Sequence, residues 1–136
     1  MAQVAAMSTV ERREVAKNPN TPPAILVQLA KDVVDVRWDV AVNTRTPPEV
    51  LVQLAGDKDE YVRRGVAVNT RTPPEVLVQL AGDEDWVVRR GVAGNDCTPV
   101  GTVVQLAGDA EIRVREAALE HWSLPLEYRV LRRVAQ

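Results

Sequence analysis

The sequence is poor in the residue types from which most metal and redox sites are built. Its 136 residues include one cysteine, Cys97, and one histidine, His121. A single cysteine excludes an intrachain disulfide, a thiolate zinc site and a cysteine-ligated iron–sulfur cluster. A single histidine likewise excludes a multi-histidine metal site. We therefore expect the chain to bind neither a metal ion nor a cofactor.

Aromatic residues are also scarce, at 4%, and phenylalanine is absent, whereas hydrophobic residues make up 46% of the chain. A core must then be assembled from Val, Leu, Ile and Ala. Positive and negative charges are nearly balanced, because the chain has 17 basic and 19 acidic residues and a formal net charge of −2. Nucleic-acid-binding domains usually carry a basic excess, so nucleic acid is a disfavoured partner.

Long hydrophobic runs and sequence motifs of catalysis are missing as well. No run approaches the roughly 20 residues of a membrane helix, and the first residues lack the charged-then-hydrophobic order of a secretory signal. We therefore expect a soluble, cytoplasmic protein that does not contact a membrane. Since no P-loop, GxGxxG motif or nucleophile elbow occurs either, the sequence favours a protein that is not an enzyme.

The most informative feature that is present is an internal repeat. Residues 43–68 and 69–94 are identical at 22 of 26 positions and differ only at 58/84, 60/86, 61/87 and 68/94. No linker separates the copies, which predicts a single domain over 1–136. A natural duplication and an idealised repeat are both compatible with this near-identity. The predicted units are a half unit at 1–17, four copies at 18–42, 43–68, 69–94 and 95–120, and a degenerate cap at 121–136.

Each unit is predicted to contain two short helices. In the second copy, Thr46 precedes a proline pair and Glu49, which is the order of an N-cap followed by a capping box. Gly56 is a typical helix end. Asp57 or Asp59 can then cap the second helix of the unit. The apolar spacing is not the alternation of a strand, so no sheet is expected.

Helices this short are marginal in isolation, which predicts that the units stack into a solenoid with contacts between neighbours only. Gly65 and Gly91 interrupt the second helices, where each costs about 1 kcal/mol relative to Ala. We expect the reason to be close approach of a neighbouring backbone or a tighter 3₁₀ turn.

The order of residues within the repeat carries a family resemblance. Residues 62–77 read VRRGVAVNTRTPPEVL, and residues 15–23 read VAKNPNTPP with leucines and Asp32 following. This pattern resembles the leucine-rich repeat variant family over about residues 10–120. The resemblance implies an all-α fold, a right-handed superhelix of alternating α and 3₁₀ helices without a sheet. Some members of the family also carry a cysteine-rich iron–sulfur domain, for which this chain lacks the cysteines.

Arginine, aspartate and asparagine each recur once per unit, and we interpret these columns as structural. The arginines are expected to bond carbonyl groups or the aspartates of adjacent units. A phosphate-binding ladder is the less favoured interpretation, because carboxylates recur beside the arginines. The members of this structural ladder are Arg37, Arg63, Arg89, Arg115, Asp57, Asp83, Asn43 and Asn69.

Positions that differ between otherwise copied units are candidates for recognition. Aromatic and arginine residues are enriched at interface hot spots, although each tryptophan could instead cover a groove between units. The glutamine that recurs at one position of each unit could bind a peptide, or it could be part of the solvated surface. The partner-binding candidates are Trp38, Tyr61, Arg64, Trp86, Arg90, Gln53 and Gln79.

The remaining polar residues are expected to have structural roles. His121 occupies the asparagine position of the last unit, and Cys97 is a free thiol in a corner. The tail at 127–136 is predicted to be an amphipathic helix that docks on the last unit through Tyr128, Leu131 and Ala135.

These features together favour a non-catalytic helical-repeat module that offers an extended surface to a protein or peptide partner. Two alternatives stay open: nucleic-acid binding through the arginine columns, and a structural unit that self-associates as a homo-oligomer.

Overall fold

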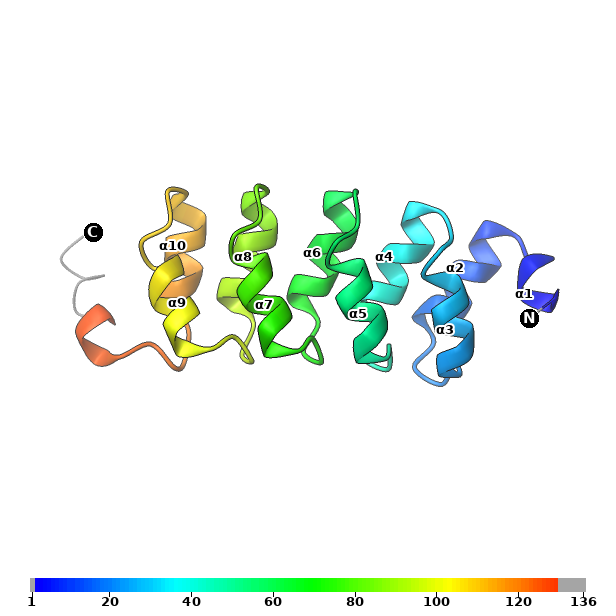
Figure 1. Ribbon diagram of the computed structural model, residues 1–136, viewed down its shortest axis with the longest axis horizontal. Helices are drawn as coiled ribbons and strands as arrows, with labels where there is room; N and C mark the ends of the chain where they lie inside the picture. The colour runs from blue at the N-terminus through cyan, green and yellow to red at the C-terminus, as the bar shows by residue number, and fades with distance from the viewer. Residues whose placement is uncertain (1, 130–136) are drawn as a thin grey trace.

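The computed structural model of the chain describes residues 2–129, which form a row of short helices (Figure 1). Ten α-helices and no strand occur in this part, so the all-α repeat architecture is confirmed. Leu131 and Ala135 of the predicted tail helix lie outside the described residues. The helices are α1 (Ala2–Ala5), α2 (Thr9–Lys17), α3 (Pro23–Leu29), α4 (Val34–Val42), α5 (Pro48–Leu54), α6 (Glu60–Val68), α7 (Pro74–Leu80), α8 (Trp86–Gly94), α9 (Val100–Leu106) and α10 (Ile112–Leu119).

Each unit contributes a first helix (α3, α5, α7 or α9) and a second helix (α4, α6, α8 or α10), and α2 is the second helix of the N-terminal half unit. Figure 1 shows the first helices in front and the second helices behind them. Consecutive second helices pack directly against one another, whereas each first helix lies between the second helices on either side. The row does not fold back on itself, so contacts join neighbouring units only.

Aliphatic side chains form a continuous core along this row. In the second copy Leu51, Leu54, Val62 and Val66 are fully buried, and the equivalent residues of the other copies repeat the pattern. No aromatic side chain belongs to the buried core of residues 4–129. No helix within 2–129 combines the length and apolar character that crossing a bilayer requires.

The starts of the first helices differ from the prediction. The N-cap of α5 is Pro47, which makes no side-chain hydrogen bond, so the capping box of Thr46 and Glu49 is wrong. The Thr46 hydroxyl instead donates to the Val40 carbonyl oxygen at 2.6 Å. It thereby satisfies a carbonyl in the last turn of α4, where the helix leaves its final carbonyls unpaired. The same bond recurs at Thr21, Thr72 and Thr98.

Helices α6 and α8 begin as predicted, with an aspartate cap, whereas α10 begins with Glu111 and α4 with Val33, which makes no capping bond. The Asp59 carboxylate accepts a hydrogen bond from the Tyr61 backbone N–H at 2.9 Å. Asp57 accepts from the Asp59 N–H at 2.9 Å and so orders the turn just before the helix. One of the two predicted residues is therefore the cap, and the other supports it.

Both helices of every complete unit are α-helices, and 3₁₀ helices are not present as separate elements in residues 2–129. In α5 the seven residues suffice for α-type bonding, as in the Ala55 N–H donating to the Leu51 carbonyl at 2.9 Å. Bonds of the 3₁₀ type are limited to the helix ends, for example from the Gly56 N–H to the Gln53 carbonyl.

Successive second helices pack closely at Gly65 and Gly91, which occupy the same position in their units. A Cβ at Gly65 would lie 2.8 Å from the Cβ of Ala41 and 3.1 Å from Cε3 of Trp38, both in α4. A Cβ at Gly91 would lie 2.9 Å from the Cβ of Ala67 in α6. Close approach of the neighbouring helix, one of the two expected reasons, therefore explains the glycines.

Replacing Gly65 with Ala should lower the free energy of unfolding by about 1–3 kcal/mol, because the added methyl group overpacks the contact with α4. Gly101→Ala in α9 is the matched control, since a Cβ there meets nothing within 4 Å. That variant should be stabilised by about 0.5–1 kcal/mol. Urea unfolding followed by circular dichroism measures both, and equal changes in the two variants would contradict the close approach.

Candidate functional site

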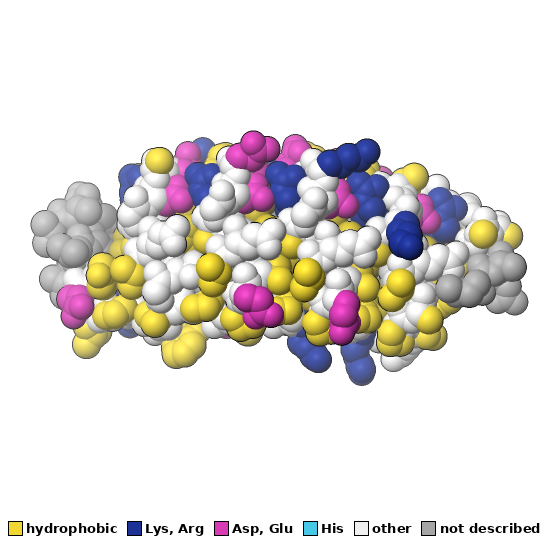
Figure 2. Space-filling model, in the orientation of Figure 1, with side chains coloured by type: hydrophobic (Ala, Val, Ile, Leu, Met, Phe, Trp, Pro, Cys, Tyr) yellow, Lys and Arg dark blue, Asp and Glu magenta, His cyan; other side chains and the backbone are white. Residues whose placement is uncertain are grey.

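A ladder of arginine–aspartate pairs runs along one long edge of the molecule. The Nε atom of Arg63 donates to Oδ2 of Asp83 in the next unit at 2.8 Å, and its Nη1 donates to the Asp57 carbonyl oxygen of its own unit at 2.8 Å. Alternating basic and acidic side chains mark this edge in Figure 2. The equivalent pairs are Arg12–Asp32, Arg37–Asp57 and Arg89–Asp109.

The last predicted arginine of this ladder has no carboxylate partner among the described residues. Nη1 of Arg115 donates to the carbonyl oxygens of Asp109 and Ala110 at 2.7 and 3.2 Å. The structure thus brings together the predicted arginines and aspartates of neighbouring units, and Arg115 retains only the bonds within its own unit.

Pairing with an arginine or an aspartate shifts the pKa values of several ladder residues. Burial by itself raises the pKa of Asp109, but hydrogen bonds from Arg89 and the Glu111 N–H outweigh it, so the pKa lies below the ordinary 3.8. The hydrogen bond to Asp109 raises the pKa of Arg89. Both partners are therefore held in their charged forms, which strengthens the hydrogen bonds between them.

A second ladder, made of buried asparagines, lies at the opposite corners of the units. Nδ2 of Asn69 donates to the carbonyl oxygens of Ala41 at 2.7 Å and Asn43 at 3.1 Å, both in the preceding unit. Asn43 and Asn95 repeat these two bonds one unit before and one unit after. Each asparagine therefore donates to one carbonyl near the end of the preceding second helix and to a second carbonyl that also accepts a backbone N–H, as Asn43 does from Thr46.

His121 continues the asparagine ladder in the last unit and is buried. Its Nε2 lies 2.8 Å from the Asn95 carbonyl oxygen, and its Nδ1 accepts from the Ser123 N–H at 3.1 Å. Because Nδ1 is an acceptor, the ring proton belongs on Nε2, which donates to Asn95. The histidine replaces one of the two asparagine bonds and has a structural place.

The two faces of the row divide the candidate recognition residues into separate groups. Gln53 and Gln79 lie on the first helices α5 and α7, where they are exposed and have no side-chain hydrogen bond to a described residue. The other five candidates all lie on the second helices α4, α6 and α8. We call their outer surface the second-helix face, defined by Trp38, Tyr61, Arg64, Trp86 and Arg90.

Trp38 and Arg64 are held by contacts within the protein, and Tyr61 contacts Arg64 but stays largely exposed. Trp38 packs on Gly65, so it covers the groove between α4 and α6. Nε of Arg64 donates to Oδ2 of Asp85 at 2.7 Å, and the guanidinium lies 4.7 Å from the Tyr61 ring centroid. Arg64 is thus held in the surface rather than free, while the Tyr61 side chain is 56% exposed.

The remaining two candidates behave differently from each other. Trp86 packs against the core and lies 3.8 Å beneath the guanidinium of Arg113 from the next unit. Arg90 is exposed and makes no hydrogen bond or ion pair with any residue in 2–129. Among the candidates, Tyr61 and Arg90 are therefore the ones most available to a partner.

Grooves between successive second helices hollow this face. One of about 410 Å³ is bounded by Trp38 and Tyr61, one of about 460 Å³ lies between α6 and α8, and one of about 450 Å³ lies between α8 and α10. Sequence reasoning missed Gly94 and Asp96, which line the middle groove. The signal was available for Gly94, because 68/94 is one of the four positions at which the copies differ.

The potential metal ligands and the single cysteine of the described residues lie apart from one another. No group of three or more His, Cys, Asp or Glu side chains is placed to hold a metal ion there. Cys97 is an exposed free thiol, whose Sγ lies 3.4 Å from the Thr70 carbonyl oxygen.

Comparison with known families agrees with this architecture. The leucine-rich repeat variant domain family matches residues 11–70, and the leucine-rich repeat variant family matches residues 62–85. Together these matches span 11–85, more than half of the 136 residues. The fold and its ladders define a helical-repeat protein. The chain belongs to the leucine-rich repeat variant family.

A solved structure described as "a leucine-rich repeat variant with a novel repetitive protein structural motif" is similar to the chain, with 28% identity and a TM-score of 0.42. The alignment covers 94% of this chain and 61% of that one, so the chain spans about three fifths of that structure's length. A search of the curated proteins found no match.

Replacing Asn69 with Ala should lower the free energy of unfolding by about 1–3 kcal/mol, because it leaves the Ala41 carbonyl without its side-chain donor, whereas the Asn43 carbonyl keeps the Thr46 N–H. Asn18→Ala is the matched control. Asn18 makes the same turn bond to the backbone N–H two residues on, but its Nδ2 donates to no described residue. The control should change stability by less than about 0.5 kcal/mol. Comparable losses in both variants, measured by urea unfolding, would show that the buried bonds contribute nothing.

Proposed function

We propose that the chain is a non-catalytic repeat module that binds a protein partner through its second-helix face. The observation that carries this proposal is where the two nearly identical copies differ. Three of the four differences, Glu60/Trp86, Tyr61/Val87 and Val68/Gly94, lie in α6 and α8, and Lys58/Glu84 lies in the loop before each helix. None lies in a first helix.

The positions that are identical in the two copies help to explain why the differences lie in and before the second helices. They include the ladder residues and the core, which every unit needs in order to stack. The second-helix face includes Tyr61 and Arg90, which take no part in the ladders or the core, and it carries grooves, aromatic side chains and arginines, the residue types favoured at hot spots. Stacking also fixes these side chains relative to one another before a partner arrives, which reduces the ordering entropy lost on binding.

The arrangement gives less support to nucleic-acid binding. In the arginine column of Arg37, Arg63 and Arg89 each guanidinium is bonded to an aspartate, so its charge is already compensated. Binding through phosphates would require free cations and would weaken steeply with salt.

A separate observation favours self-association through the other face. Val27, Val52 and Val78 are 45%, 52% and 51% exposed and occupy the same position on α3, α5 and α7. Figure 2 shows hydrophobic side chains in a band over this side of the molecule. The valine stripe is therefore the surface through which a homo-oligomer would form, and light scattering distinguishes that state from a monomer.

The double variant Tyr61→Ala/Arg90→Ala should reduce recovery of the partner by about tenfold or more, because the two most available side chains of the face are truncated. Affinity capture from the organism that carries the chain, followed by quantitative mass spectrometry, makes the measurement. Gln53→Ala/Gln79→Ala is the control on the first-helix side and should leave recovery unchanged. Loss of the partner in the glutamine variant, with retention in the other, would assign binding to the opposite face.

A further inference from the structure

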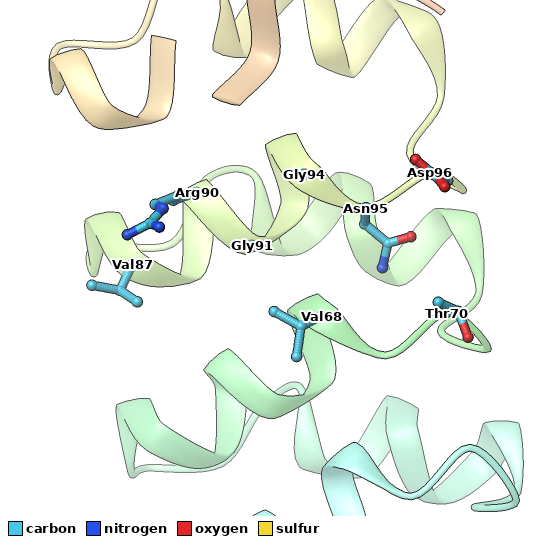
Figure 3. A pocket seen from close by; sticks show the side chains of 8 residues that line it. All are labelled: Val68, Thr70, Val87, Arg90, Gly91, Gly94, Asn95 and Asp96. Carbon is cyan, nitrogen blue, oxygen red and sulfur yellow. The ribbon is translucent and has the colours of Figure 1, made fainter. Parts of the chain in front are cut away.

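The middle groove of the second-helix face, which we call the α6–α8 groove, differs from its neighbours in shape. Figure 3 shows Gly91 and Gly94 on α8, with Val68 opposite them on α6. Gly94 occupies the last helical position, which is Val42 in α4 and Val68 in α6. A Cβ at Gly94 would meet nothing within 4 Å, so no packing demand explains this glycine. Gly94 lines the groove, whose volume of about 460 Å³ is similar to the 450 Å³ of the α8–α10 groove, and it leaves the space above it free of a side chain.

The groove also presents Arg90, and the carboxylate at the position equivalent to the partner of Arg64 is bonded to another arginine. Arg64 pairs with Asp85, 21 positions later, and the residue 21 positions after Arg90 is Glu111. Glu111 instead accepts from Nε of Arg113 at 2.8 Å. Arg113 is fixed in turn, because its guanidinium stacks on Trp86. The preceding unit has Val87 where this unit has Arg113, so Arg113 takes Glu111 and the Arg90 guanidinium is left without a partner among the described residues.

The two ends of the groove carry opposite charges. In Figure 3 Arg90 lies at one end and Asp96 at the other, with the two glycines between them. Neither charged side chain has a hydrogen bond or ion pair within the described residues. The apolar side chains of Val68 and Val87 also line the groove. The Asn95 side chain adds no free donor, since its Nδ2 is used in the asparagine ladder.

We propose that the α6–α8 groove binds a short peptide segment of the partner protein that carries an acidic and a basic residue on either side of an apolar one. The carboxylate of the peptide pairs with Arg90, the apolar side chain enters the space above Gly94 against Val68, and the basic side chain lies toward Asp96. This inference rests on the proposed function and adds to it the chemistry of the bound segment. A polyanion fits less well, because Asp96 repels it and the groove offers a single cation.

The test begins with selection of binders from a displayed library of random twelve-residue peptides on the purified chain. We expect the enriched peptides to share an acidic and a basic residue flanking an apolar residue. Binding of a selected peptide, measured by fluorescence anisotropy, should weaken at least about tenfold in Gly94→Val and in Arg90→Glu. Both substitutions install residues that the fold already accepts at these positions, since Val68 and Glu116 occupy them in other units.

Two matched variants control for changes in helix propensity and net charge. Gly101→Val adds the same side chain at an open position on α9, and Arg45→Glu reverses an exposed arginine that does not line the groove, in the corner at the start of unit 43–68. Both should bind the peptide as the parent chain does. A peptide in which the acidic residue is replaced by lysine should bind poorly to the parent chain and recover affinity for Arg90→Glu, which identifies the paired atoms directly.

The outcomes separate this inference from the proposed function. If peptides are selected and their binding is lost in Tyr61→Ala but kept in Gly94→Val and Arg90→Glu, the face binds a partner and the groove assignment is overturned. If no peptide is enriched, or if light scattering shows a dimer that Gly94→Val abolishes, the peptide is the wrong occupant. If the captured partner is also insensitive to every variant of this face, the proposed function fails as well.

Discussion

The structure depends on bonds that each unit makes with the next. An arginine reaches forward to an aspartate, as from Arg63 to Asp83, and an asparagine reaches back to two carbonyl groups, as from Asn69 to Ala41 and Asn43. The first type lies at one edge of the row and the second at the other, so each second helix is held near both ends. Helices of seven to nine residues, too short to persist alone, are thereby fixed in a common register.

This requirement divides the repeat into positions that must be copied and positions that are free to differ. The core, the ladders and the close approach at Gly65 and Gly91 use nearly every residue of the inner surfaces. The exposed positions of the second helices are not used, and there the near-identical copies differ. A difference between units can also change a neighbouring ion pair. Arg113, which stands where the preceding unit has Val87, lies over Trp86 and pairs with Glu111, and Arg90 has no partner among the described residues.

The sequence predicted those parts of the structure that depend on periodicity. The helix pairs, the aliphatic core, the aspartate cap at Asp59 and the close packing of the glycines follow from the spacing of residues within one unit. The role of Thr46 could not be predicted in this way, because its hydroxyl can accept from the helix that follows or donate to the one that precedes. The freedom of Arg90 depends on competition among side chains of two successive units, which repeat spacing alone does not resolve.

The account's central claim is that the units are coupled in register to their immediate neighbours. The most direct measurement compares urea unfolding of the chain after deletion of a whole unit, residues 69–94, with unfolding after deletion of residues 69–81. The whole-unit deletion places Arg63 in register with Asp109, and it places Asn95 in register with the carbonyls of Ala41 and Asn43 that Asn69 bonds in the parent chain, so it should unfold cooperatively with reduced stability. The half-unit deletion should abolish cooperative unfolding. Equal tolerance of the two deletions would contradict the coupling.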